Sequence, residues 1–363
     1  MRLKKIIINN FRGVRSAEIE GFKRINFFLG KNNSCKTTIL EAIFLNIGLT
    51  NPMLSININR LRDLRQTEAD DFRFIFYNLD YQNIPKFESH FDENNHVRTL
   101  EIVPHKCSST NGSLNKKELD EDIIISSIET SLEKKAVDGI TLKTSIKERR
   151  QQRKFFSSEV IREGISFLIT EPKEYKESVT GVFLFSSSPD PKLDTRLERL
   201  IVKKAHKPIV DILNTIDNSI RDLSLGTNGM IYFDIGIERL IPINLAGDGI
   251  RSILSILVTV ADTKDGIIVI DEIDTGLHFS SQSTLLKAVL QATEEYNVQI
   301  FATTHNYETL RNLKDVLDNE EMERHRTEIK TFTLRRTPDN KINSYSYDYE
   351  KLLYAIGQEI EIR

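Results

Sequence analysis

Eight residues near the N-terminus carry the clearest chemical pattern in the sequence. Residues 30–37, here called the phosphate loop, read Gly-Lys-Asn-Asn-Ser-Cys-Lys-Thr and lie between the apolar run 25–29 and a stretch with helical apolar spacing. The loop nearly matches GxxxxGK[ST], a pattern whose backbone N–H groups surround phosphates at a helix N-terminus. We predict that Lys36 binds the β and γ phosphates of a nucleotide and that Thr37 holds Mg²⁺. The other predicted nucleotide ligands are Asn32, Asn33, Ser34 and Cys35 of the loop and Thr38, which follows it.

Cys35 stands where the pattern has its second glycine. Such a position favours positive φ, at which a non-glycine residue costs roughly 1 kcal/mol. A tightly bound ligand can offset this strain, so we expect a functional loop; the alternative is a degenerate loop that no longer binds nucleotide. The helix dipole lowers the pKa of a thiol at this place, which predicts a reactive Cys35 thiolate in the absence of nucleotide.

Two adjacent carboxylates follow a second β-branched run. Asp271 and Glu272 come directly after residues 267–270, and His305 follows the next expected strand. We predict that Asp271 belongs to the magnesium site and that Glu272 polarises the water that attacks the γ-phosphate. His305 is predicted to contact that phosphate, with a structural role at a strand end as the alternative.

A glycine-rich turn precedes the helix expected at 250–262. Residues 244–249 read Asn-Leu-Ala-Gly-Asp-Gly. Such a turn either is a flexible connection or binds an anion, because free N–H groups and the helix dipole point outward there. Since the chain already has one phosphate loop, a second anion site needs a phosphate from another copy. We therefore predict that Gly247, Asp248 and Gly249 contact nucleotide across an interface.

Apolar periodicity predicts the elements that position these residues. Strands are expected at 3–9, 25–29, 72–79, 97–103, 182–185, 231–243, 267–270 and 298–303. Helices are expected at 37–49, 194–216, 250–262 and 280–295. Strands alternate with helices in the second half, which favours a parallel sheet. The polar stretch at about 104–180 is predicted to be an inserted subdomain between lobe one, 1–103, and lobe two, 181–363.

Composition limits the functions that the chain can have. With 363 residues, 39% of them hydrophobic, it can bury a sizeable core. A net charge of −3 neither requires nor excludes a nucleic-acid partner. The two cysteines, Cys35 and Cys107, are too few for a disulfide framework, and no apolar run is long enough for a signal peptide or a membrane span. We expect a cytoplasmic protein without a membrane segment.

Taken in order, the motifs resemble those of ABC-type ATPase heads in the SMC, RecF and OLD (overcoming lysogenization defect) group. The resemblance covers about 1–103 and 181–363 and implies one α/β P-loop head, residues 1–363, with a mainly parallel core sheet and a strand-rich N-terminal lobe. Besides the phosphate loop, it rests on Asn10-Phe11-Arg12-Gly13, Leu245-Ala246-Gly247-Asp248-Gly249, Asp271-Glu272, Asp274 in Asp-Thr-Gly-Leu-His, His305 and the closing residues 357–363.

The resemblance also implies roles for single residues. Arg12 approaches the nucleotide, residues 245–249 form the signature that reads the γ-phosphate of the opposite subunit, Asp274 lies in the D-loop, and His305 is the switch histidine. ATP and Mg²⁺ are the implied ligands, and a homodimer or higher homo-oligomer is the implied assembly. Ala246 replaces the usual signature serine, which removes one hydrogen bond to the γ-phosphate.

Three functions stay open at this point. The first is an ATP-driven switch that controls a separately encoded effector, a nuclease by analogy, in bacterial antiphage defence, similar to the ATPase partners of two-gene systems of the PARIS type. No Toprim domain follows His305, so the chain itself is not expected to cut nucleic acid. The second is a RecF-like DNA-binding repair ATPase, and the third is a nucleotide-binding scaffold that does not hydrolyse. The basic residues considered for DNA are Lys203, Lys204, His206 and Lys207, or Arg149, Arg150, Arg153 and Lys154.

Overall fold

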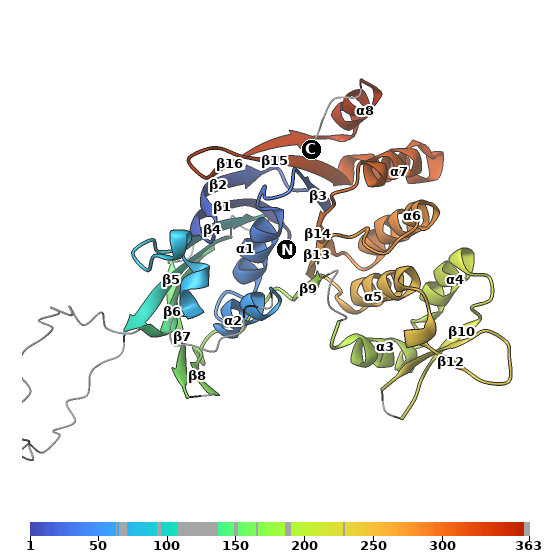
Figure 1. The fold of residues 1–363 in the computed structure, drawn as a ribbon, viewed down its shortest axis with the longest axis horizontal. Coiled ribbons are helices and arrows are strands. Elements are labelled where there is room, and N and C mark those ends of the chain that lie inside the picture. Colours follow the sequence, from blue (N-terminus) through green and yellow to red (C-terminus); the bar gives the residue numbers. More distant parts are fainter. Residues whose placement is uncertain are drawn as a thin grey trace, which may run out of the picture.

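One large mixed sheet runs through the molecule in this computed structural model (Figure 1). The structure describes residues 1–62, 64, 71–92, 96–106, 137–148, 152–164, 166–185, 190–227 and 229–358. In that part of the chain, the strands of the sheet are β1 (Leu3–Phe11), β2 (Val14–Glu20), β3 (Ile25–Leu29), β4 (Lys86–Phe91), β5 (Val97–Lys106), β6 (Val137–Lys147), β7 (Lys154–Glu163), β8 (Ser166–Thr170), β9 (Gly181–Phe185), β13 (Ile267–Asp271), β14 (Gln299–Thr303), β15 (Ile329–Arg336) and β16 (Lys341–Tyr347). The helices are α1 (Lys36–Ile47), α2 (Met53–Arg60), α3 (Leu193–Val202), α4 (Lys207–Ile216), α5 (Asp248–Asp262), α6 (Phe279–Glu295), α7 (Tyr307–Asp318) and α8 (Tyr349–Gly357).

Five neighbouring strands, in the order β15-β3-β14-β13-β9, pair in parallel and form the centre of the sheet. Helix α1 lies on one face of this centre, and α5, α6 and α7 lie on the other (Figure 1). In β13, Ile268 and Ile270 join the core under α5 and α6, whereas Ile267 and Val269 join the core under α1. Burial on both faces explains why the strand reads as a continuous β-branched run. The predicted α/β fold with a parallel core is therefore confirmed.

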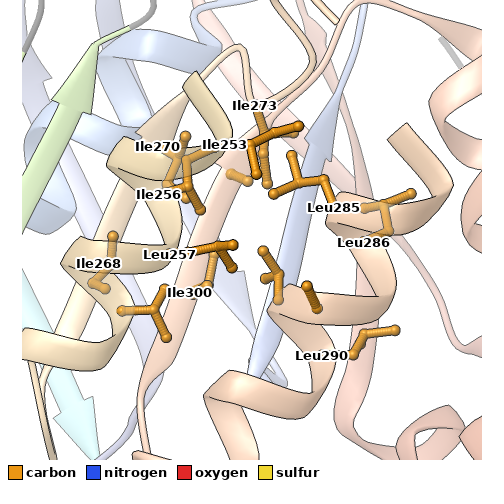
Figure 2. Packing of buried hydrophobic residues seen from close by; sticks show 14 of the residues in the cluster. Ile253, Ile256, Leu257, Ile268, Ile270, Ile273, Leu285, Leu286, Leu290 and Ile300 are labelled. Carbon is orange, nitrogen blue, oxygen red and sulfur yellow. The ribbon is translucent and has the colours of Figure 1, made fainter. Parts of the chain in front are cut away.

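Helices α5 and α6 pack against the centre of the sheet through branched apolar side chains (Figure 2). Ile253, Ile256 and Leu257 of α5 recur at helical spacing and are buried, and Leu285 and Leu286 of α6 belong to the same cluster. This packing fixes the N-terminus of α5, where the signature lies, relative to the carboxyl end of β13.

The rest of the sheet is antiparallel, apart from the pair β16 and β2. Strands β1 and β2 pair with each other, and β4 to β8 continue the sheet from β1 as a run of antiparallel neighbours. Strands β6, β7 and β8 come from the predicted insertion, and they extend the sheet of the first lobe. The boundaries of lobes and insertion stay a prediction, and residues 107–136, with Cys107, lie outside the described residues.

A second, three-stranded sheet lies against α4, which contacts its strand β10 (Figure 1). It consists of β10 (Asp222–Leu225), β11 (Ile231–Asp234) and β12 (Ile241–Pro242), all antiparallel. Its strands account for the strand-rich stretch predicted at 231–243. The chain passes from β12 through a short 3-10 turn directly into the signature and α5. The end of this sheet therefore adjoins the signature turn.

Two predicted elements were wrong. Residues 72–79 form 3-10 helices, Asp71–Ile75 and Tyr77–Leu79, instead of a strand. The buried residues there are Phe72, Ile75 and Phe76, spaced by three and four positions as in a helical turn rather than by two as in a strand.

The single helix predicted at 194–216 is two helices, α3 and α4. Lys204 has a φ angle of 57°, which ends α3, and Pro208 lies in the first turn of α4. Proline has no N–H to continue an earlier helix, but it suits the first turn of a new one.

No helix in the described part of the chain is long and apolar enough to cross a membrane.

Candidate nucleotide site

The phosphate loop connects the buried strand β3 to α1 and contains three residues with positive φ angles, one of which is Asn33, with a φ angle of 66°. Gly30 has a φ angle of 146°, and a Cβ atom there would lie 2.5 Å from Ser34 Oγ and 2.6 Å from the carbonyl oxygen of Leu334. Only glycine fits this place. Cys35, the residue before α1, has a φ angle of 66° and ψ of 25°. The position that replaces the second glycine therefore does adopt the left-handed conformation that glycine favours.

Lys36 lies inside the loop rather than in solvent. Its Nζ atom donates hydrogen bonds to the carbonyl oxygens of Gly30, at 2.7 Å, and Lys31, at 3.1 Å. Burial lowers the pKa of Lys36, and the nearby carboxylates of Asp271 and Glu272 oppose that shift. A largely desolvated ammonium group is thus held where the loop would surround a phosphate.

A cavity of about 770 Å³, here called the loop cavity, opens above the loop. Every predicted loop ligand lines it, and two more arginines, Arg62 and Arg336, do so as well. The predicted site residues on its wall are Arg12, Asn32, Asn33, Ser34, Cys35, Lys36, Thr37, Thr38 and His305. The concentration of cations around one cavity suits a polyanionic ligand.

The two predicted magnesium ligands lie together. Thr37 Oγ1 donates a hydrogen bond to Asp271, 3.0 Å from Oδ2 and 3.2 Å from Oδ1. Thr303 Oγ1 donates to the same carboxylate, 2.6 Å from Oδ1, and so fixes its orientation. A hydroxyl and a carboxylate are oxygen ligands of the kind that Mg²⁺ takes, and it commonly uses only one or two from the protein besides phosphate oxygens. The residues therefore fit a magnesium ion.

Glu272 and His305 also lie together, at the carboxyl ends of β13 and β14. Glu272 Oε1 is 3.4 Å from His305 Nε2, and Glu272 Oε2 accepts a hydrogen bond from Thr275 Oγ1 at 3.1 Å. Glu272 has a φ angle of 54°, and its backbone N–H donates to Thr303 Oγ1 at 2.7 Å. Strained backbone of this kind is concentrated at functional sites. Thr303 thus holds the Asp271 carboxylate and the backbone of Glu272.

The Asp274 carboxylate accepts hydrogen bonds from side chains of its own chain. Its Oδ2 atom accepts hydrogen bonds from Thr304 Oγ1 and Thr309 Oγ1, both at 2.9 Å. Thr309 belongs to α7, so the carboxylate connects the D-loop to that helix. Asp274 is absent from the described lining of the loop cavity, and its predicted contact with nucleotide stays a prediction.

The signature turn lies away from the loop cavity of its own chain. Gly247 is the residue before α5, and a Cβ atom there would meet nothing within 4 Å. A Cβ atom on Gly249 would lie 2.9 Å from the carbonyl oxygen of Gly276 in the D-loop. Asp248 forms an ion pair with Arg251 and lines a second cavity, of about 450 Å³. The contact of these residues with nucleotide across an interface stays a prediction.

A buried glutamate that was not among the predicted site residues holds Arg12. Glu41 of α1 is fully buried and forms ion pairs with Arg12 Nε at 2.8 Å and with Arg62 Nε at 2.6 Å. Burial lowers the pKa of Arg12 to about 10, although Glu41 opposes this shift. Arg12 therefore lies at the cavity with its guanidinium already paired. A glutamate between Leu40 and Ala42, on the apolar face of a helix, could have indicated a buried cationic partner.

The predicted thiolate at Cys35 was wrong. Burial raises the pKa of the Cys35 thiol, and the nearby cations Arg336, Arg62 and Lys36 only partly oppose it. The helix dipole lowers the pKa of a thiol at this place, but the loss of water around the sulfur, which depends on the fold, raises it more.

Among the described residues considered for DNA binding, Arg153 and Lys154 are exposed where β7 begins, and two others lie close to carboxylates. Lys207 pairs with Asp211 at 3.6 Å, and His206 lies 3.5 Å from Asp222. Lys203 and Lys204 are exposed where α3 ends. Arg149, Arg150 and the closing residues 359–363 lie outside the described residues.

Comparison with known proteins identifies the family of the chain and two relatives. The family model described as "AAA domain, putative AbiEii toxin, Type IV TA system" matches residues 25–311. An ATP/GTP phosphatase from Helicobacter pylori is 25% identical over 392 residues, covering 98% of each chain. The DNA replication and repair protein RecF from Glaesserella parasuis is 50% identical, but over only 44 residues and 12% of each chain.

A solved structure shows the same fold. The SmcHead bound to the C-winged helix domain of ScpA matches with a TM-score of 0.51 and 12% identity, covering 97% of this chain and 99% of that one. The family match includes the phosphate loop, Asp271, Glu272 and His305. The chain therefore belongs to this AAA-domain family and has the fold of an SMC ATPase head.

Proposed function

We propose that the chain binds ATP with Mg²⁺, hydrolyses it to ADP and phosphate, and does so at sites that two copies complete for each other. The contact between Thr37 and Asp271, with Glu272 and His305 at the adjoining strand ends, carries this proposal. It assembles a phosphate loop, a magnesium site and a carboxylate base in one place. The relative from Helicobacter pylori is described as an ATP/GTP phosphatase, and its sequence matches this chain along nearly its whole length. This match supports the same chemistry.

Each residue has a distinct part in this proposal. Lys36 would leave the loop carbonyls and bind the β and γ phosphates, while Thr37 and Asp271 would hold Mg²⁺, which neutralises phosphate charge. Glu272 would orient the attacking water and accept its proton at a carboxylate oxygen. His305, on the cavity wall, would donate a hydrogen bond to the γ-phosphate. Catalysis would then rest on positioning and electrostatics, as phosphoryl transfer requires.

The second copy would supply its signature turn. The backbone around Gly247 is open to solvent, and Leu245 beside it is 74% exposed. Free N–H groups at the start of α5 would face the γ-phosphate of the partner, and Leu245 would lose its contact with water. Such an arrangement makes the bound nucleotide part of the interface, so that ATP would tighten a homodimer.

The cellular role that we propose is a cytoplasmic switch that controls a separately encoded effector, a nuclease by analogy, in bacterial defence against phage. The description of the family names a toxin of a toxin–antitoxin system, and this supports a role in defence. The likeness to heads of the OLD group and to PARIS-type ATPases belongs to this proposal too. Co-purification of the effector with the ATP-bound chain, and its release on hydrolysis, would test the role directly.

The alternatives have narrower support. The RecF match spans 44 residues and 12% of the chain, so it supports a shared motif more than a shared role in repair. A scaffold that binds without hydrolysis is favoured by Cys35 and Ala246, the two departures from the motifs.

Phosphate release from ATP separates the hydrolysing functions from the scaffold that only binds nucleotide. The parent chain should turn over ATP in a Mg²⁺-dependent manner, Lys36→Ala should lose binding, and Glu272→Gln should bind without turnover. Glu163→Gln, at an exposed carboxylate of β7, serves as the matched control. Binding without any turnover by the parent would favour the scaffold instead.

A further inference from the structure

The loop cavity has a second wall that the proposed chemistry does not use. Phe74, Asn78 and Leu79 line it, opposite in character to the cationic phosphate loop. Asn78 has a φ angle of 53° and Leu79 one of 57°. Two consecutive left-handed residues therefore form this wall, and one of them is a leucine, for which the conformation is unfavourable.

Burial does not explain the strained leucine. The Leu79 side chain is 51% exposed, so little apolar burial offsets the backbone cost. Neighbouring contacts hold the turn in place: the Leu79 N–H donates to the carbonyl oxygen of Phe76 at 3.1 Å, and buried Phe76 forms a β-bridge with Phe11. Strain that the surroundings maintain, at a cavity wall, points to a ligand contact.

A chain of hydrogen bonds ties this wall to the phosphate loop. The Tyr77 hydroxyl accepts a hydrogen bond from Asn340 Nδ2 at 2.8 Å, and Asn340 Oδ1 accepts one from Arg336 Nε at 2.9 Å. Arg336 Nη1 in turn donates to Asn33 Oδ1 in the loop at 3.4 Å. The apolar wall is thus positioned relative to the place of the phosphates, as a site for the other end of a nucleotide requires.

Arg12, which also lines the cavity, forms hydrogen bonds with the backbone of the same wall. Its backbone N–H donates to the carbonyl oxygen of Ile75 at 3.0 Å, and its Nη1 atom donates to that of Phe74 at 3.4 Å. The turn is therefore connected at both sides to residues that line the loop cavity.

We propose that this wall is the nucleobase subsite and that it takes a purine. Leu79 packs against the face of the ring, with Phe74 beside it, and the exposed amide of Asn78 contacts the edge of the base. The inference rests on the proposed function, because it assigns the base end of the same nucleotide. It makes Leu79 and Asn78 the residues that set base preference.

The chemistry of Asn78 predicts a broad purine specificity. An amide has both a donor and an acceptor, and it can present them in either order. The edge of adenine offers an N6 donor and an N1 acceptor, and that of guanine offers an O6 acceptor and an N1 donor. One amide therefore satisfies both bases, and ATP and GTP are expected to bind within about tenfold of each other. A pyrimidine covers less of Leu79 and binds more weakly.

Calorimetric titration in the presence of Mg²⁺ tests the subsite, with Glu272→Gln as the background so that nucleotide is not consumed. Four probes are compared: ATP, GTP, UTP and inorganic tripolyphosphate. Leu79→Ala should weaken ATP and GTP about tenfold and change tripolyphosphate less than about twofold, because only the apolar contact is lost. Leu79→Met, which keeps the apolar area, should retain most of the affinity.

Two further variants keep the result interpretable. Leu79→Gly relieves the backbone strain, so it should fold at least as well as the parent and still lose ATP affinity. Leu168→Ala removes a leucine that is 49% exposed on the edge strand β8 and should change nothing.

Unchanged ATP affinity in Leu79→Ala and Leu79→Gly would overturn the subsite, as would an equal loss for tripolyphosphate. A parent chain that bound neither ATP nor tripolyphosphate would overturn the proposed function as well. A parent that bound both, with silent Leu79 variants, would overturn the subsite alone.

Discussion

Thr37 Oγ1 lies 3.0 Å from Asp271 Oδ2, although the two residues are 234 positions apart in the chain. The contact joins the first turn of α1 to the carboxyl end of β13. Because β13 and β3 lie on either side of β14 in one parallel sheet, their carboxyl ends meet at the same edge. The order of the strands therefore brings the two proposed magnesium ligands together.

The first prediction concerns this pair. Thr37→Ala removes one ligand, so the Mg²⁺ concentration for half-maximal ATP turnover should rise at least about tenfold. Thr37→Ser keeps the hydroxyl and is the matched control. Titration of Mg²⁺ at saturating ATP measures the change, and an unaltered requirement in Thr37→Ala would show that the hydroxyl holds no metal.

The second prediction concerns Glu41, which pairs with two arginines inside the protein. Glu41→Ala leaves both guanidinium groups without their shared carboxylate, so the free energy of unfolding should fall by about 3–5 kcal/mol. Glu18→Ala, which removes an exposed partner of Lys5, should cost less than about 1 kcal/mol. Urea denaturation of both variants checks this, and equal losses would contradict a buried network.

The third prediction concerns Cys35. Because burial raises the pKa of its thiol, the thiolate fraction at pH 7 is smaller than for a free cysteine. Alkylation should be slow at pH 7, accelerate only at a higher pH than for a free cysteine, and be blocked by Mg²⁺ and ATP. Peptide mass spectrometry follows the reaction, and labelling that nucleotide does not slow would place the ligand elsewhere.

The left-handed backbone at Cys35 gives a separate test. Glycine adopts this conformation freely, so Cys35→Gly should bind ATP at least as well as the parent. Cys35→Val places a β-branched residue at positive φ and should lose affinity. Calorimetry compares the two, and equal affinities would mean that the loop changes its backbone on binding.

The fourth prediction contrasts two glycines of the signature turn. Gly249→Ala brings a Cβ atom to 2.9 Å from the Gly276 carbonyl oxygen and should cost about 1–3 kcal/mol in stability. Gly247→Ala meets open space and should cost less than about 0.5 kcal/mol. Thermal unfolding distinguishes them, and a reversed order would contradict the described packing of the turn.

The motifs and elements that depend on residues close together in the sequence were predicted correctly. The phosphate loop, the run before Asp271 and the helical spacing of α5 are local patterns, and the structure has them at the expected places. Residues 72–79 were mistaken for a strand, because apolar content was read without its spacing. The break at Pro208 shows the same limit, since an amphipathic pattern continues across a helix end.

Contacts between segments that are distant in the chain could not be predicted from local sequence patterns. The pairing of Glu41 with Arg12 and Arg62 joins α1 to two other segments, and no local pattern gives their distance. The pKa of Cys35 likewise depends on burial by the surrounding fold. The left-handed turn at Asn78 and Leu79 carries no glycine to mark it, so the proposed base subsite had no sequence signal.

The central claim is that two copies share each ATP site, and a mixing experiment tests it most directly. Lys36→Ala lacks a working phosphate loop and Gly247→Arg lacks a working signature, so each should be inactive alone. In a mixed dimer, one site combines the intact loop of one chain with the intact signature of the other, while the introduced arginine faces the empty loop. An equal mixture should therefore recover about one quarter of the parental turnover, because half of the dimers are mixed and each has one complete site of two. Full activity of Gly247→Arg alone, or no recovery in mixtures that form mixed dimers, would contradict the shared site.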